Sequence, residues 1–126
     1  MKRHASLVTL SRDHHAALVL AKRIADCAED AAQLRALCET VALRFRTELQ
    51  PHFEDEEQRI LPRLAGCHDA QWQQTLSDHA NLRALAARIA EGDAIALRQF
   101  GIALNAHVRF EERELFPLYE ALIPQG

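Results

Sequence analysis

Two short segments of the sequence carry the same arrangement of histidine and glutamate. His52 is followed four residues later by Glu56 in HFEDEEQRILP, and His107 is followed four residues later by Glu111 in HVRFEERELFP. Residues four apart project from one face of an α-helix, one turn apart. Each segment can therefore present an imidazole and a carboxylate together. Because the spacing is identical in both copies, the pair indicates a site built from two halves.

A second repeat supplies two more histidines. The segment DHHAALVLAKRIA, beginning at Asp13, aligns without gaps with DHANLRALAARIA, beginning at Asp78. This alignment makes His14, rather than His15, the counterpart of His79. The chain is therefore interpreted as two related helical hairpins, of which the first has the longer connection.

Helices must position these side chains, because the apolar residues recur with helical periodicity and Gly and Pro are few. The first predicted helix carries the apolar stripe Leu10, Ala17, Leu20, Ala21 and Ile24. The second helix is predicted to start near Asp30 and to stop between Pro62 and Gly66. The third is predicted to start after Asp69 as its N-cap and to stop at Glu91. The fourth is predicted to be capped by Asp93 and to stop before Pro124.

The connections between these helices are short, so sequential helices are expected to lie antiparallel. The predicted fold is all-α, an antiparallel up-down-up-down four-helix bundle formed by residues 1–126 as a single domain. A chain of this length is large enough to bury one core.

The helical rise tests whether the histidines share one level of such a bundle. His79 precedes Gly92 and His107 follows it by similar stretches of chain, so both are about 20 Å from that turn. Glu56 and His79 likewise lie at similar separations on either side of Gly66. The helices can therefore bring their histidines and glutamates to a common level.

Four imidazoles and two carboxylates at one level predict a metal site. Buried carboxylates cost several kcal/mol each unless a cation compensates them. Four nitrogens and two carboxylates suit two metal ions, each held by two histidines and bridged by both glutamates. An added oxo or hydroxo bridge would give each ion about five ligands and leave an open position for a small molecule. Mixed imidazole and carboxylate ligation favours iron, with zinc or manganese as alternatives.

With these residues the sequence resembles the hemerythrin-like, or HHE cation-binding, domain family. The segments PHFEDEE and HVRFEERELFP carry the resemblance most specifically, and it covers nearly the whole chain. It implies an antiparallel four-helix bundle with a non-haem di-iron centre. By match to the motif, the implied terminal ligands are His14, His52, His79 and His107, and the implied bridging ligands are Glu56 and Glu111.

The sequence departs from the ligand pattern of the oxygen-carrying hemerythrins. Those proteins place a second histidine four residues from the third-helix histidine and end with H-x-x-x-x-D, whereas here Thr75 and Arg83 flank His79 and the last helix has Glu111. The ligand set is similar to that of the di-iron domain in iron–sulfur cluster repair proteins. It implies a position open to dioxygen, nitric oxide or peroxide. The ferritin-like pattern, Glu-x-x-His on two helices, has the reverse order.

Several residues near the motif have expected roles outside the ligand set. His4, His15 and His68 are expected to face solvent or to cap helices, with His15 retained as an alternative ligand. Glu57 and Glu112 follow the motif glutamates by one position, about 100° round the helix. They are therefore expected to face solvent or a neighbouring helix.

Two residues near the His-x-x-x-Glu motifs each have two possible roles, and a third predicts a local irregularity of its helix. Glu48 lies one turn before His52 and could accept a hydrogen bond from its second ring nitrogen, or be solvated. Phe110 could limit the access of water, or pack as ordinary core. Pro51 cannot donate a backbone hydrogen bond, which predicts a kink just before His52. Its counterpart is Ala106, so the two halves should differ there.

Composition excludes several classes of partner. The formal net charge is −3 and no basic stripe is present, so no nucleic acid is expected as a partner. No apolar run is long enough to cross a membrane, and the start MKRHASLVTL lacks the features of a signal peptide. Cys27, Cys38 and Cys67 show no C-x-x-C spacing and are expected to be reduced thiols of a cytoplasmic protein.

Three functions are consistent with the sequence. The first is a di-iron protein that binds or senses O2, NO or iron. The second is a di-iron enzyme of the oxidative or nitrosative stress response, or of iron–sulfur cluster repair. The third is a metal-free helical interaction module. Because the sequence begins directly with its first helix, without the cysteine-bearing N-terminal segment that repair proteins often carry, binding or sensing is favoured. Enzymatic activity and oligomeric state are left open.

Overall fold

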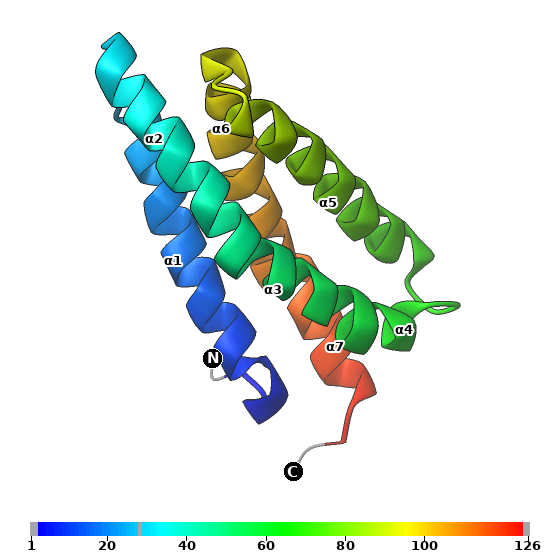
Figure 1. Ribbon diagram of the computed structural model, residues 1–126. Helices are drawn as coiled ribbons and strands as arrows, with labels where there is room; N and C mark the ends of the chain where they lie inside the picture. The colour runs from blue at the N-terminus through cyan, green and yellow to red at the C-terminus, as the bar shows by residue number, and fades with distance from the viewer. Residues whose placement is uncertain (1–2, 28, 125–126) are drawn as a thin grey trace.

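The computed structural model describes residues 3–27 and 29–124, and most of them are helical (Figure 1). Four long helices form a bundle. The first is α1 (Val8–Ala25), preceded by the 3-10 turn η1 (Ala5–Leu7), and the third is α5 (Asp69–Ala90). The second contains α2 (Ala31–Arg44), η2 (Phe45–Leu49), α3 (Gln50–Asp55), η3 (Glu56–Ile60) and α4 (Leu61–Leu64); the fourth contains α6 (Ala94–Phe110), η4 (Glu111–Leu115) and α7 (Phe116–Leu122).

The predicted all-helical bundle is confirmed, and no strand occurs within residues 3–27 and 29–124. In Figure 1 the ends of the chain and the connection from α4 to α5 lie at one end of the bundle, and the other two connections lie at the opposite end. Helix α6 packs against both α1 and α5, and α2 packs against α5. None of the helices in the described residues is long and apolar enough to cross a membrane.

The segments η2, η3 and η4 are π-helical turns, and each ends two residues before a proline. A proline ring clashes with the carbonyl four residues before it, and it has no N–H to donate. A turn widened to five residues resolves the clash: the N–H of Leu61, directly before Pro62, bonds to the carbonyl of Glu56. The second helix is irregular before Pro51, whereas α6 is continuous at Ala106, which confirms the predicted difference between the halves.

One of the two predicted helix caps is confirmed, because Asp93 accepts a backbone N–H from the first turn of α6. Asp30, predicted only to lie near the start of the second helix, caps α2 in the same way. The predicted cap at Asp69 was wrong by one residue, because α5 begins at Asp69 and its N-cap is His68. The carboxylate of Asp69 instead accepts the N–H of Gly66 at 2.8 Å, which closes a turn that Gly66 enters with φ 82°.

The apolar core is divided into two clusters by a polar layer. The larger cluster includes Ala17, Phe53, Leu82, Leu104 and Val108. The smaller cluster, which we call the lower cluster, is formed by Leu7, Leu10, Ile60, Leu61, Leu64, Leu115, Phe116 and Tyr119. Among the candidate metal ligands, His14, Glu56 and Glu111 lie between residues of the two clusters along their helices, and His52 and His107 lie beside residues of the larger cluster. The fold therefore buries ionisable groups in the middle of its core.

Candidate metal centre

All six predicted ligands are buried and converge in this polar layer. None of them is more than 5% exposed, and both glutamates are fully buried. The first helix contributes one histidine, the third contributes one, and the second and fourth contribute a histidine and a glutamate each. In chain order they are His14, His52, Glu56, His79, His107 and Glu111.

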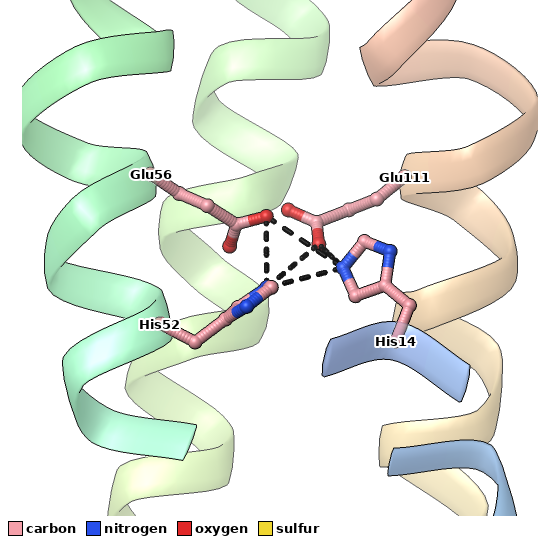
Figure 2. A group of neighbouring side chains, drawn as sticks. All are labelled: His14, His52, Glu56 and Glu111. Atoms are coloured by element: carbon pink, nitrogen blue, oxygen red, sulfur yellow. Dashed lines mark hydrogen bonds and ion pairs between the residues drawn. The ribbon is translucent and has the colours of Figure 1, made fainter. Parts of the chain in front are cut away.

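Four of the six form a first group that is shown in Figure 2. The Nε2 atom of His14 lies 2.8 Å from Oε1 of Glu111. The Nε2 atom of His52 lies 3.2 Å from Oε2 of Glu56. The two Nε2 atoms are 3.1 Å apart, so the rings point at each other as well as at the carboxylates.

The second group uses the same two glutamates together with His79 and His107. The Nε2 atom of His79 lies 3.0 Å from Oε1 of Glu56, and that of His107 lies 3.3 Å from Oε1 of Glu111. Within each group the candidate ligand atoms lie within 4.8 Å of one another. Glu56 thus faces one histidine of the first group with Oε2 and one of the second with Oε1. That is the placement required of a carboxylate shared by two cations.

Three buried atoms of this cluster have no hydrogen-bond partner in the described part of the chain. They are Oε2 of Glu56, Oε2 of Glu111 and Nε2 of His107. Unpaired polar atoms in a protein interior are costly, and each such group calls for an explanation. Two carboxylate oxygens and a ring nitrogen turned into one enclosed space are all electron-pair donors once the nitrogen is deprotonated. This donor set fits metal cations with imidazole and carboxylate preference.

Each histidine is also held at its other ring nitrogen by a carboxylate. The pairs and their Nδ1–oxygen distances are His14–Glu112 at 2.6 Å, His52–Asp13 at 3.1 Å, His79–Glu57 at 2.7 Å and His107–Asp78 at 2.9 Å. A carboxylate that accepts the Nδ1 proton fixes the tautomer and leaves the Nε2 lone pair for a metal ion. The four pairs follow the internal repeat, since each aspartate precedes a histidine and each glutamate follows a motif glutamate.

No role in the site was predicted from the sequence for these carboxylate partners. Glu57 and Glu112 were expected to face solvent or a neighbouring helix. They face neighbouring helices, where they accept hydrogen bonds from histidines. Glu48 does not reach His52; it forms a 2.7 Å ion pair with Arg44. The repeated dipeptides Asp-His and Glu-Glu were the available signal. Both are copied in the two halves together with the ligands.

Two phenylalanines stack on candidate ligand rings. Phe53 stacks on His79 with ring centroids 4.1 Å apart and an interplanar angle of 15°. Phe116 stacks on His14 at 5.0 Å and 17°. Phe110 is half-buried and packs against the lower cluster. Of its two predicted roles, ordinary packing is confirmed.

The carboxylates strongly perturb the titration of the histidines. Burial alone would lower the pKa of His14, but hydrogen bonds to Glu111 and Glu112 prevail and raise it to about 11. For His107 burial is likewise outweighed, by the charge of Glu111 and the hydrogen bond to Asp78, and the pKa rises to about 10. In return, His107 and its neighbours hold the pKa of Glu111 well below its usual range despite burial. Without a cation, the cluster is balanced by protons.

A small cavity adjoins the candidate ligands. Its volume is about 10 Å³, the space of roughly one water molecule. Its polar lining is given by Asp13 and three of the histidines, and the rest is apolar: Ala17, Leu49, Phe53, Leu104 and Val108. A larger surface cleft of about 490 Å³ between α5 and α6 also reaches His107 and Asp78. The inner space therefore holds no more than about one water molecule, and most of its lining is apolar.

The remaining histidines lie outside the cluster. His15 is exposed on α1, which places it away from the layer of candidate ligands. The ring of His4 contacts Ser6 Oγ at 2.8 Å and the carbonyl of Pro124 at 3.1 Å, and its Nδ1 accepts the N–H of Ser6 at the start of η1. His68 takes the N-cap position of α5 without a side-chain cap bond. A fifth histidine ligand is therefore not found among the described residues.

Comparison with known proteins agrees with this geometry. The family model described as Hemerythrin HHE cation binding domain matches residues 6–119, nearly the whole chain. No curated protein and no solved structure gives a match.

Proposed function

The chain belongs to the hemerythrin HHE cation-binding domain family, and from this premise we propose that it is a non-haem di-iron protein that binds or senses small diatomic molecules. The observation that carries the proposal is the pair of buried groups that share both glutamates. One group adds His14 and His52 to the shared carboxylates, and the other adds His79 and His107. The proposed domain spans residues 1–126, with its four helices in antiparallel order.

In this proposal the six candidate ligands hold two ions. His14 and His52 would hold one ion, and His79 and His107 would hold the other. Glu56 and Glu111 would serve both ions, since each carboxylate lies beside histidines of both groups. When bound, two adjacent iron ions would supply redox chemistry and a binding position for O2, NO or peroxide. Zinc or manganese is a less favoured occupant of the same donors.

The side chains around the ligands define what such a centre could do. The four Nδ1-bonded carboxylates orient the rings and make the imidazoles stronger donors. The apolar lining of the small cavity excludes bulk water and larger solutes. Asp78, which lines the surface cleft, accepts the Nδ1 proton of His107 and so links that ring to the solvent side of the site. These features favour reversible handling of a small molecule over hydrolysis of a large one.

The alternative in the same class is an enzyme of oxidative or nitrosative stress, or of iron–sulfur cluster repair. The surface cleft beside His107 and Asp78 is the feature that favours it, because the cleft brings solvent within one hydrogen bond of a candidate ligand. A metal-free interaction module is disfavoured by the buried unpaired atoms of Glu56 and Glu111.

Metal analysis tests the proposal directly. Protein purified after expression in iron-replete medium should contain about two irons per chain and absorb in the near ultraviolet. Brief exposure of the reduced protein to O2 or NO in a stopped-flow instrument should give an adduct that is lost when the gas is removed. Rapid irreversible oxidation would instead favour the enzyme, and protein that takes up no metal from excess iron, zinc or manganese would refute the metal centre.

A further inference from the structure

Arg83 lies beside His79 and contacts two of the groups that hold it. Its NH1 and NH2 atoms lie 2.9 and 3.0 Å from the two carboxylate oxygens of Glu57, which in turn accepts the Nδ1 proton of His79. The guanidinium also lies over the ring of Phe53, 5.8 Å from its centroid, and this ring stacks on His79. Arg83 therefore contacts both the carboxylate bonded to the edge of the His79 ring and the phenyl ring stacked on its face.

Arg3 makes a corresponding set of contacts around His14. Its Nε and NH2 atoms lie 3.2 and 3.1 Å from Oε1 of Glu112, which accepts the Nδ1 proton of His14. Its guanidinium carbon lies 5.7 Å from the ring centroid of Phe116, and this ring stacks on His14. Ser11 donates a further hydrogen bond to Glu112 at 2.9 Å. We call each set of Arg, Glu, Phe and His an arginine box.

The internal repeat accounts for only part of the two boxes. At the offset of the Asp-His repeat, the counterpart of Arg3 is His68 and the counterpart of Arg83 is Leu18. The two stacking rings are not equivalent either, because at the offset of the two His-x-x-x-Glu motifs Phe53 corresponds to Val108. The glutamate and the histidine of each box thus follow the repeat, whereas the arginine and the phenylalanine come from unrelated positions in the two halves. Inheritance from the repeat therefore does not explain the arginine and the ring that complete each box.

The other two candidate ligands have no such box. His52 and His107 are held at Nδ1 by Asp13 and Asp78, and neither aspartate forms an ion pair with an arginine in the described residues. Asp78 receives only a neutral amide, from Gln74 at 2.7 Å. Neither ring is stacked face to face with a phenylalanine; Phe53 contacts them edge-on, at interplanar angles of 72° and 85°.

We propose that Arg3 and Arg83 are positioning residues that hold His14 and His79 as the rigid pair of ligands, and leave His52 and His107 as the compliant pair. A guanidinium that contacts a carboxylate through two N–H groups fixes the carboxylate in orientation, which a single hydrogen bond does not. Rotation of a boxed imidazole must break its Nδ1 bond and its stacking together. Only one consequence of this inference rests on the proposed function: each ion would be held by one rigid and one compliant histidine.

The first experiment uses the metal-free protein, so it does not depend on the proposed metal. Exchange of the four histidine Nδ1 protons with water is measured by nuclear magnetic resonance in wild type, Arg83→Gln and Arg3→Gln. Arg83→Gln should speed exchange at His79 by about tenfold and leave His14 within twofold. Arg3→Gln should do the reverse. Equal changes at both rings, or none, would overturn the proposal.

The matched control is Arg59→Gln, which removes a comparable two-contact ion pair with Asp55 (2.7 and 3.0 Å) on the outside of the bundle. It should leave all four rings unchanged. Arg83→Lys keeps the charge but loses the planar fork, and should give an intermediate rate at His79. It also serves if Arg83→Gln does not fold. An effect of Arg59→Gln as large as that of Arg83→Gln would show that loss of any such pair loosens the rings.

The second experiment measures the rate at which a chelator removes Co²⁺ from the loaded protein. Arg83→Gln should release the ion about tenfold faster than wild type, and Arg59→Gln should not. Unchanged release from Arg83→Gln would refute a role for the box in holding metal. Wild-type protein that binds no Co²⁺, Zn²⁺ or iron would refute the proposed function, while the exchange experiment would still decide whether the arginines fix the rings.

Discussion

Raising the pH should tighten metal binding to this site, because each ion must displace a proton. The pKa of His14 is raised to about 11 and that of His107 to about 10 by the surrounding carboxylates, against the opposing effect of burial. At pH 7 these rings therefore carry protons on nitrogens that a metal ion needs. A metal ion binds the neutral imidazole, so binding releases the proton to solvent.

The number of protons follows from the geometry of the two groups. The Nε2 atoms of His14 and His52 are 3.1 Å apart, so a proton on one is directed at the lone pair of the other and the two rings share it. The pKa of His52 is raised as well, burial notwithstanding, by the charge of Glu56 and a hydrogen bond to Glu111, but the charge of His14 lowers it and so opposes a second proton on this pair of rings. One shared proton in the first group and one on His107 in the second give about one proton displaced per ion. Each binding constant should then rise about tenfold per pH unit between pH 7 and 8.

Calorimetric titration with Zn²⁺ in two buffers of different ionisation enthalpy measures the protons released, and competition with a coloured chelator at pH 7 and 8 measures the affinity. We expect about two protons per chain at pH 7 for two ions. Release of no proton together with a flat affinity would show that the histidines are neutral in the metal-free protein. The reasoning about the carboxylate cluster would then be wrong.

The remaining predictions concern single side chains and the metal-free fold. His107→Ala should lower the metal content to about one ion per chain or less and should also lower the melting temperature. The surface variant His15→Ala should do neither. Full metal loading of His107→Ala would contradict the ligand assignment. Gly101→Ala places a Cβ 2.8 Å from Cγ2 of Ile24 and should lower the free energy of unfolding in urea by about 1–3 kcal/mol. Combined with Ile24→Ala, the loss of stability should be smaller than the sum of the two single losses. Additive losses would exclude the clash as the cause. Phe53→Ala should cost about 3–5 kcal/mol as a buried cavity, and a loss under about 1 kcal/mol would show that the ring is not close-packed. The pKa values of His14 and His107 are raised on folding, so the contribution of these two rings to metal-free stability is complete below about pH 6.5 and is lost as pH rises through about 10 to 11. Unfolding measured from pH 7 to 11 should show this fall, and constant stability would argue against a charge on these two rings.

The positions of the ligands could be predicted because they depend on features that are local in the sequence. A spacing of four residues fixes that His52 and Glu56 share a helix face, and the repeat transfers this to His107 and Glu111. The rise per residue then sets the level. The repeat also selected His14 over its neighbour, and the structure buries His14 and exposes His15.

The residues behind the ligands could not be placed by the same reasoning. Asp13 bonds to a histidine on the second helix rather than to its neighbour in sequence, and Glu112 bonds to one on the first. Such contacts depend on how two helices are rotated against each other, and the π-helical turns change that rotation by inserting an extra residue per turn. Of the prolines that cause the turns, only Pro51 was predicted to disturb its helix, and no irregularity was predicted at Pro62 or Pro117. The second helix ends at Leu64, within the predicted range, and the fourth continues through Pro117 to Leu122, as predicted.

The polar layer links the proposed function to the stability of the fold. Along the second helix, Glu56 separates Phe53 of the larger apolar cluster from Ile60 of the lower one, and Glu111 does the same between Val108 and Leu115. A bundle built only for packing would place apolar residues there, since replacing buried charges by well-fitted apolar groups is often neutral or stabilising. Protons balance the charges in the metal-free protein, but they leave carboxylate oxygens unpaired. Cations would satisfy both requirements at once, so under the proposed function occupation of the site would also consolidate the core.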